Sequence, residues 1–140
     1  MLIETRVKIS KIVDDKIRKS VTTLLTDSET LIDALASVMS HLSVLQSSHQ
    51  IEDADILGCK QSSIKEVATQ FDGEKSYVAT LKDIWIDEVG DEKSLRYKVL
   101  LYAADLTECN TRVQQLAREG YDMQIESLTE VDMLFLENEE

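Results

Sequence analysis

The stretch Arg96-Tyr97-Lys98-Val99-Leu100-Leu101-Tyr102, which continues as Ala103-Ala104-Asp105-Leu106-Thr107-Glu108, decides the fold. Its first seven residues include aromatic and β-branched side chains and predict a strand. Asp105 followed three residues later by Glu108 has the pattern of a capping box, in which Asp105 accepts a hydrogen bond from the first helical turn. We therefore expect a helix to begin directly after the strand.

The residues that follow continue this pattern. Apolar residues recur at spacings of three, four and three, which places them on one face of a helix: Leu106, Cys109, Val113 and Leu116. Gly120 is expected to end the helix, because glycine takes the left-handed conformation without steric cost. Tyr121, Met123 and Ile125 then alternate with polar residues and predict a strand with one solvated face. The stretch from Leu95 to Val131 therefore reads strand, helix, strand.

The first half of the chain has the same order. A strand ending at Leu25 precedes a helix cap at Thr26 or Asp27, and the expected helix carries an apolar stripe: Leu31, Leu35, Val38, Leu42 and Leu45. One constant offset aligns Val21 with Val99 and Asp27 with Asp105. The string Ser-x-x-Glu-Val occurs in both halves, at Ser63–Val67 and Ser127–Val131. These matches predict a duplicated structural unit.

An additional strand precedes each of these stretches. Leu2–Val13 and the strand that starts at Lys16 flank Asp14-Asp15, a candidate tight turn, and Ser76–Asp87 is the corresponding first strand of the second half. Each copy is then β-β-α-β. We expect one domain over residues 1–140, made of a first unit at 1–70 and a second at 76–137. The segment Phe71–Lys75, which contains Asp-Gly, is the expected hinge.

The fold class predicted in this way is α+β, with tandem pseudo-twofold β-β-α-β repeats forming a largely antiparallel sheet with two main helices. A unit of this size is too small to bury both a sheet face and a helix alone. We therefore expect the copies to share one hydrophobic core. Either both helices lie on one face of a continuous sheet, or two sheets pack face to face with the helices outside.

Composition limits the classes of partner. The chain has 140 residues and a formal net charge of −12, with the hydrophobic and charged content of a globular protein. A strongly acidic chain disfavours direct binding to nucleic acid, because phosphates are neutralised by lysine and arginine. A basic protein partner, including a nucleic-acid-binding protein of the host, remains open, and so does an acidic surface that mimics DNA. No apolar run approaches the roughly 20 residues that span a bilayer, so we expect no membrane association and a cytoplasmic location.

Residues with catalytic or metal-binding chemistry do not form a motif. His41 and His49 have no acidic or cysteine ligand at helical spacing, and the two cysteines, Cys59 and Cys109, match no zinc or redox pattern. The glycines are isolated, so no glycine-rich phosphate loop is present. We expect a non-enzymatic protein with no metal and no cofactor.

Aromatic residues supply the binding candidates. Trp85 lies between Ile84 and Ile86 on an expected strand, where it either packs in the core or forms a surface for a partner or for self-association. The neighbouring residues Arg96, Tyr97, Lys98 and Tyr102 form a small basic and aromatic cluster. This cluster could hold an anionic ligand such as a nucleotide.

The tandem β-β-α-β pattern, with Ala103-Ala104-Asp105-Leu106 opening the second helix, resembles an uncharacterised family of small two-repeat proteins from Bacteroidetes, their phages and mobile elements. The resemblance implies a phage or mobile-element setting, hence the host cytoplasm, and brings no activity with it. We expect an acidic accessory factor that docks on and modulates a host or phage protein. It would bind by an acidic face or an exposed sheet edge, and the edge could also form a homo-oligomer. The alternatives are a nucleotide-binding or nucleotide-sequestering protein and a virion or assembly component.

Overall fold

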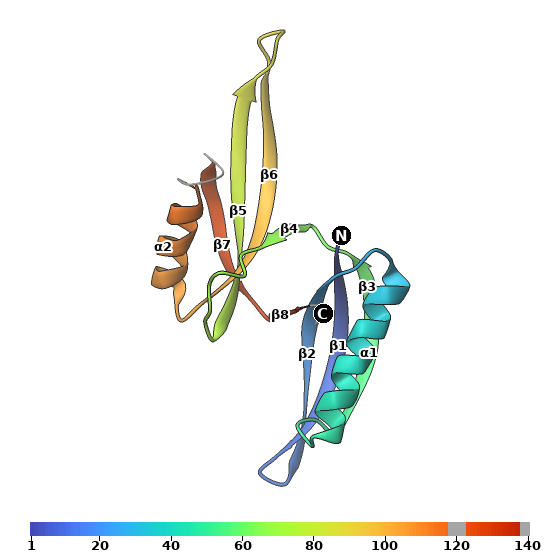
Figure 1. Ribbon diagram of the computed structural model, residues 1–140. Coiled ribbons are helices and arrows are strands. Elements are labelled where there is room, and N and C mark those ends of the chain that lie inside the picture. The colour runs from blue at the N-terminus through green and yellow to red at the C-terminus, as the bar shows by residue number, and fades with distance from the viewer. Residues whose placement is uncertain (118–122, 138–140) are drawn as a thin grey trace. The chain divides into compact units, whose positions relative to one another are not determined.

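The computed structural model describes residues 1–117 and 123–137. The chain forms two compact units, each with a four-stranded sheet and one helix (Figure 1). Unit 1 contains Met1–Ser62 and the chain from Met133 onward, and unit 2 contains Ser63–Asp132. None of the helices within the described ranges is long and apolar enough to cross a membrane.

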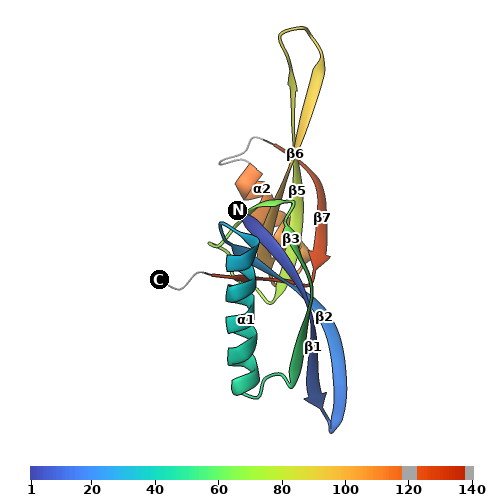
Figure 2. The same ribbon diagram turned by 90° about the vertical axis from the view of Figure 1, so that its right-hand side faces the viewer.

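Unit 1 is built from β1 (Leu2–Val13), β2 (Lys16–Asp27), α1 (Leu31–Ser47), β3 (Asp53–Gln61) and β8 (Met133–Leu136). Its strand order is β3-β1-β2-β8. β1 pairs antiparallel with both β2 and β3, whereas β8 pairs parallel with β2. The helix lies along one face of this sheet (Figure 2).

Unit 2 is built from β4 (Ile64–Val67), β5 (Lys75–Ile86), β6 (Glu92–Ala103), α2 (Leu106–Leu116) and β7 (Gln124–Val131). Its strand order is β4-β6-β5-β7. Starting from β7, this is the order of unit 1, because β7, β5, β6 and β4 take the places of β3, β1, β2 and β8. β5 pairs antiparallel with β6 and β7, and β4 pairs parallel with β6. The prediction of an α+β fold with repeated, mostly antiparallel units is confirmed.

The hairpins follow from local sequence signals. Asp14 and Asp15 both have positive φ, 52° and 62°, which is the geometry of the two-residue turn that matches the twist of a hairpin. The second hairpin has a longer loop that contains Gly90 at φ 89°. Both hairpins pair twelve residues per strand, and both lead into a capped helix.

The structure corrects the alignment of the two copies. Leu24 corresponds to Val99, and the N-cap Thr30 corresponds to the N-cap Asp105. With this alignment, the strand residues that face the helix in one unit match those that face the helix in the other. The predicted match of Asp27 with Asp105, and a cap at Thr26 or Asp27, are wrong. Asp27 is instead the last residue of β2, where its Oδ1 lies 3.1 Å from the N-terminal ammonium.

The edge strands carry the same irregularity at matched positions. β3 and β7 each contain a bulge, at Leu57 and at Glu126, where one extra residue opposes the neighbouring strand. A bulge bends the strand and turns the following side chains to the other face. Its recurrence at the same place supports the repeat more strongly than the short strings of residues do.

The Ser-x-x-Glu-Val match pairs strands with different roles. Ser63–Val67 falls on β4, whereas Ser127–Val131 is the end of β7. The strand that corresponds to β4 in the second repeat is β8. Ile64 of β4 pairs with Lys98, and Met133 of β8 pairs with Thr23, which is the residue of unit 1 that matches Lys98. Each repeat is therefore β-β-α-β-β rather than β-β-α-β.

The fourth strand of each repeat completes the sheet of the other unit. The chain passes into unit 2 after Ser62 and returns to unit 1 after Asp132, so the division differs from the boundaries expected at 70 and 76. The segment Phe71–Lys75 is not a hinge between units, since it joins β4 to β5 inside unit 2. At Gly73 an added Cβ would lie 2.4 Å from the Ala103 backbone, so this segment is closely packed.

Among the described residues, each unit has a cluster of buried apolar residues of its own, where one core common to both copies was expected. A strand gained from the other half of the chain widens each sheet to four strands, which suffices to cover one helix. The buried residues on the helices are Ala34, Val38 and Leu42 in α1, and Cys109, Val113 and Leu116 in α2. The first helical residues, Leu31 and Leu106, were predicted to be buried but are exposed. Gly120 and Tyr121 lie outside the described residues.

Candidate functional site

The β5–β6 hairpin continues past α2 and β7 as a two-stranded ribbon (Figure 1). The pairing of β5 with β7 stops at Lys82, so residues 83–95 project beyond the edge strand. We call these residues the acidic arm. Large apolar side chains are exposed along it: Ile84, Trp85, Ile86, Val89 and Leu95.

Trp85 lies on the face of the sheet that α2 covers. It is opposite Lys93, and alternation places it on the same side as Leu81 and Tyr97, which belong to or pack against the core of unit 2. Trp85 is nevertheless 44% exposed, because it lies beyond the part of the strand that the helix covers. Trp85 is therefore a surface residue and not a core residue, and its role in binding a partner stays a prediction.

The loop at the end of the acidic arm is ordered by Asp87. Its Oδ1 accepts hydrogen bonds from the backbone N–H groups of Val89 and Asp91, at 3.0 and 2.9 Å. Lys93 Nζ lies 4.0 Å from Asp87 Oδ2. Val89, which is 85% exposed, is thus presented to solvent on a loop with a defined conformation.

The acidic arm is the most negatively charged hairpin of the chain. It contains five carboxylates, from Asp83, Asp87, Glu88, Asp91 and Glu92, and a single lysine. Apolar side chains framed by like charges disfavour random association of this acidic protein with itself and favour a cationic partner.

The basic and aromatic cluster expected around Tyr97 is divided between the two faces of β6. Arg96, Lys98 and Tyr102 alternate onto the face without the helix, whereas Tyr97 packs against the core of unit 2. The Tyr97 hydroxyl donates to Glu66 Oε2 at 3.4 Å. Burial and the charge of Glu66 raise the pKa of Tyr97. Tyr97 therefore does not join the other three around one ligand.

Arg96 is neutralised by a carboxylate from β7. Its Nε and Nη2 donate to Glu126 at 2.7 and 3.0 Å, a bidentate pair that reaches across β5. Glu126 is the bulge residue of β7, and the bulge turns it toward Arg96. The hydrogen bond from Arg96 lowers the pKa of Glu126. This pairing leaves Lys98 as the remaining cation of the predicted anion site.

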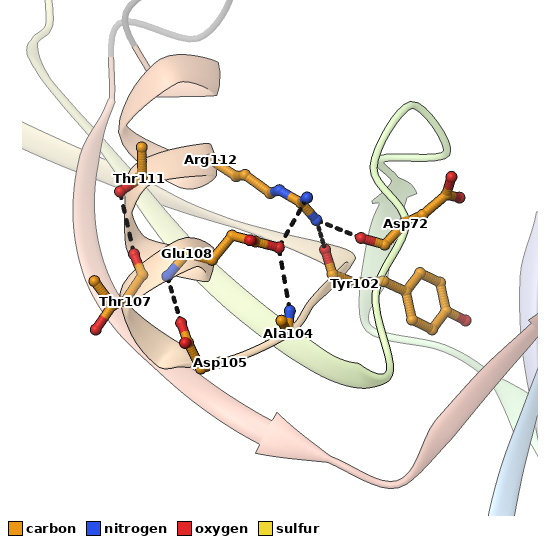
Figure 3. Close-up of polar contacts among 8 residues, drawn as sticks. All are labelled: Asp72, Tyr102, Ala104, Asp105, Thr107, Glu108, Thr111 and Arg112. Carbon is orange, nitrogen blue, oxygen red and sulfur yellow. Dashed lines mark hydrogen bonds and ion pairs between the residues drawn. The ribbon is translucent and has the colours of Figure 1, made fainter.

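A second polar cluster, which the sequence analysis did not identify, surrounds Arg112 (Figure 3). Arg112 Nη1 donates to the carbonyl oxygens of Asp72, at 2.7 Å, and of Tyr102. Its guanidinium lies 5.1 Å from the Phe71 ring, and Nη2 is 2.8 Å from Glu108 Oε1. The ring of Tyr102 points away from Arg112 in Figure 3. Only the i, i+4 spacing of Glu108 and Arg112 could have indicated this cluster.

The Arg112 cluster is part of the scaffold. Asp105 Oδ1 accepts from the Glu108 backbone N–H at 2.8 Å, and Glu108 Oε1 accepts from the Ala104 N–H at 3.2 Å, so the predicted cap is confirmed. Arg112 joins this cap to the Phe71–Gly73 loop and to the end of β6. Because its donors are directed at backbone carbonyls, Arg112 fixes the loop rather than presenting its charge to a ligand.

The cysteines and histidines do not converge in the described part of the chain, where no group of three or more His, Cys, Asp or Glu side chains could hold a metal ion. Burial raises the pKa of the Cys109 thiol to about 11, which keeps it protonated. The Thr5 hydroxyl donates to Cys59 Sγ at 3.5 Å.

These features define a small α+β protein of two repeated units with exchanged edge strands and an apolar, acidic arm. The chain belongs to the family described as a domain of unknown function (DUF4494), whose profile matches residues 1–135. A search of curated proteins found no match.

Proposed function

We propose that the chain is a non-enzymatic binding protein and that the acidic arm is its docking element. The observation that carries this proposal is the exposure of Trp85 among four other large apolar side chains on one projecting hairpin. Tryptophan is among the residues that dominate the energetics of protein interfaces. Exposed large apolar side chains gathered on one projecting element commonly mark such an interface.

The chemistry of the arm defines the partner. Burying one large apolar side chain contributes roughly 1.5–3 kcal/mol, and Trp85 and Leu95, which lie on the same face of the arm, would offset part of the cost of association in this way. The carboxylates around them select a partner surface that carries lysine or arginine around an apolar pocket. The proposed partner is therefore a basic protein, including one that binds nucleic acid.

The setting of this activity comes from the sequence resemblance. We propose an accessory factor of a phage or mobile element, acting in the host cytoplasm on a host or phage protein and modulating or inhibiting it. A nucleotide-binding protein and a virion component are alternative proposals. The first predicts a rise of several degrees in melting temperature with a nucleotide, and the second predicts stoichiometric amounts of the chain in purified particles.

The test compares proteins captured from host cells by the tagged full chain and by a variant with Trp85→Ser and Ile86→Ser. Both residues are exposed, so the variant is expected to keep the fold. We expect quantitative mass spectrometry to find basic proteins retained by the native chain and reduced at least tenfold with the variant.

The first repeat supplies the matched control. Ile12 and Ile17 face each other near the end of the β1–β2 hairpin and are 56% and 68% exposed. Replacing both with serine removes a similar apolar area from the other hairpin and should leave capture unchanged. Equal losses with the two variants, or retention of the same proteins by the Trp85→Ser, Ile86→Ser variant, would remove the basis for the acidic arm as docking element.

A further inference from the structure

The lysine and arginine side chains of the two units differ in whether a carboxylate neutralises them. In unit 2, Lys75, Lys93, Arg96 and Arg112 each form an ion pair. In unit 1, no lysine or arginine side chain forms an ion pair with any residue that the structure describes. Most of these unpaired cations lie on the β1–β2 hairpin: Arg6, Lys8, Lys11, Lys16, Arg18 and Lys19.

These six cations make one element positive in an acidic protein. We call residues 6–19 the basic hairpin. It contains only two carboxylates, those of Asp14 and Asp15 in the turn, whereas the whole chain has a net charge of −12. Charges more than a Debye length of about 8 Å away are largely screened at physiological ionic strength, so local charge governs what this hairpin binds. The expectation that the chain makes no direct contact with nucleic acid was based on the net charge, which is not evenly distributed.

The end of the basic hairpin is free of neighbouring elements of unit 1. The pairing of β1 with β3 ends at Ser10, opposite Asp53, and the pairing of β2 with β8 begins at Thr23. Every residue from Lys11 to Val21 is exposed. The hairpin therefore ends as a two-stranded ribbon whose two faces are both open to solvent.

The cations are distributed over both faces of this hairpin. The register with β1 and the alternation of side chains place three on the side of the helix, namely Lys11, Lys16 and Arg18. The other three point to the opposite side, namely Arg6, Lys8 and Lys19. A flat acidic surface could meet only one of these faces, whereas a groove lined by phosphates on both walls could meet both.

The corresponding positions of unit 2 show that the fold does not require these charges. Lys11 corresponds to Trp85 and Arg18 corresponds to Lys93. In the same alignment Lys16 and Lys19 correspond to Asp91 and Ser94. A positive hairpin is thus a property of unit 1 alone, and neither packing nor pairing within the repeat explains it.

We propose that the basic hairpin binds duplex DNA through its phosphates, with the ribbon from Lys11 to Val21 in the major groove. This groove is about 12 Å wide and admits a two-stranded β-ribbon, whereas the major groove of duplex RNA is deep and narrow. Residues 1–27 include no aromatic side chain on which the bases of a single strand could stack. The aliphatic side chains of Ile12, Val13 and Ile17 cannot hydrogen-bond to base edges, so binding is independent of base sequence.

This proposal does not rest on the acidic arm, which belongs to the other unit. The test is fluorescence anisotropy of a labelled duplex of about 20 base pairs with the full chain, between about 0.05 M and about 0.2 M NaCl. With about four phosphates neutralised, the affinity should fall roughly a hundredfold over this range. Two duplexes of unrelated sequence should bind equally, and single-stranded DNA and duplex RNA of the same length should bind at least tenfold more weakly.

Two double variants with the same net charge locate the site. Lys11→Gln with Arg18→Gln should weaken binding at least tenfold and lower the slope of log affinity against log salt by about two. Lys65→Gln with Lys93→Gln removes the same charge from unit 2, including the position that matches Arg18, and should leave the affinity unchanged. All four residues are exposed, so circular dichroism should show unaltered folds.

Four outcomes would each overturn the proposal. The first is an absence of binding at the lowest salt concentration, and the second is tighter binding of the single strand than of the duplex. The third is an equal loss in the two double variants, which would mean that only the net charge matters. The fourth is equally effective competition by polyglutamate at the same concentration of charge, which would mean that any acidic chain, including the acidic arm of a second copy, fits the hairpin.

Discussion

The two units share a backbone and differ in the chemistry of its surface. Both have a twelve-residue hairpin, a capped helix, a bulged edge strand and a short parallel strand from the other repeat. Near the hairpin ends, the matched pairs on the helix side are Lys11 with Arg18 in unit 1 and Trp85 with Lys93 in unit 2. The same scaffold position thus carries two cations in one unit and an exposed tryptophan opposite a lysine in the other.

The faces without a helix differ in the same manner. In unit 2, Arg96 and Glu126 form a bidentate ion pair across β5. The matched positions in unit 1 hold Val21 and Leu57, which are both exposed and apolar. Core packing and strand exchange therefore constrain the repeat, whereas its outer positions differ in chemistry between the two units.

The largest effect is expected from the exchanged strands. Ala68 directly follows β4, is 3% exposed in the core of unit 2, and donates its N–H to Leu100 O at 2.8 Å. Ala68→Asp buries a carboxylate without a partner there, so we expect a loss of about 3 kcal/mol or more. Urea unfolding with hydrogen exchange should show the loss of protection in β5 and β6, although Ala68 follows the strands of unit 1 in sequence.

The reciprocal substitution is Leu136→Asp at the other exchanged strand. Leu136 packs against the core of unit 1 but is only half-buried, so the expected loss is smaller, about 1–2 kcal/mol, and it should appear in β1 and β2. If the Leu136 variant lost protection in unit 2 while unit 1 was unaffected, the placement of β8 in the sheet of unit 1 would be contradicted.

Two glycines, Gly73 in the loop between β4 and β5 and Gly58 in β3, should give the next largest effect and should separate the units. Gly73 lies against the Ala103 backbone, which cannot move aside as a side chain could, so Gly73→Ala is expected to cost about 2–3 kcal/mol. Gly58 in β3 has no atom within 4 Å of an added Cβ, and Gly58→Ala should change the free energy of unfolding by less than about 0.5 kcal/mol. Equal midpoints of denaturation for the two variants would show that the close approach at Gly73 is absent.

Local signals in the sequence predicted the local structure. The Asp105 and Glu108 cap, the Asp14-Asp15 turn and the alternating strands depend on residues near one another in the chain, and each is confirmed. The exchange of β4 and β8 depends on which distant strand each one meets. A four-residue strand contains too little pattern to specify that partner. The string Ser-x-x-Glu-Val gave a wrong alignment of strands, because the two segments share residue types and not a position in the sheet.

The candidate site was predictable only in part. The sequence identified Trp85 and Arg96, but alternation alone could not show that the helix stops short of Trp85 and leaves it exposed. The bulge at Glu126 reverses the side-chain alternation of β7, so the ion pair with Arg96 could not be predicted from strand periodicity. Arg112 was missed because its acceptors are backbone carbonyls, which carry no residue-type signal.

The smallest effect is expected from acid, and it should be confined to unit 2. The hydrogen bond from Arg96 holds the pKa of Glu126 below its usual range in the folded protein. A carboxyl group with a lowered pKa stabilises the folded state above its ordinary pKa, and this contribution disappears as the pH falls through the lowered value. Hydrogen exchange of β5 and β7 should therefore accelerate slightly in that acidic window, and Glu126→Gln should abolish the pH dependence that the pair causes.

Unit 1 provides the internal control for this titration, since Val21 and Leu57 at the matched positions do not ionise. Hydrogen exchange in β1 and β3 should change less over the same pH range. The effect of the net charge, which both units share, is removed by comparison with Glu126→Gln. Because the pair is exposed, salt screens it, and high ionic strength should reduce the difference between the units. A difference that persists unchanged in Glu126→Gln would mean that other carboxylates of unit 2 cause it, and the ion pair would then contribute nothing to the contrast between the two faces.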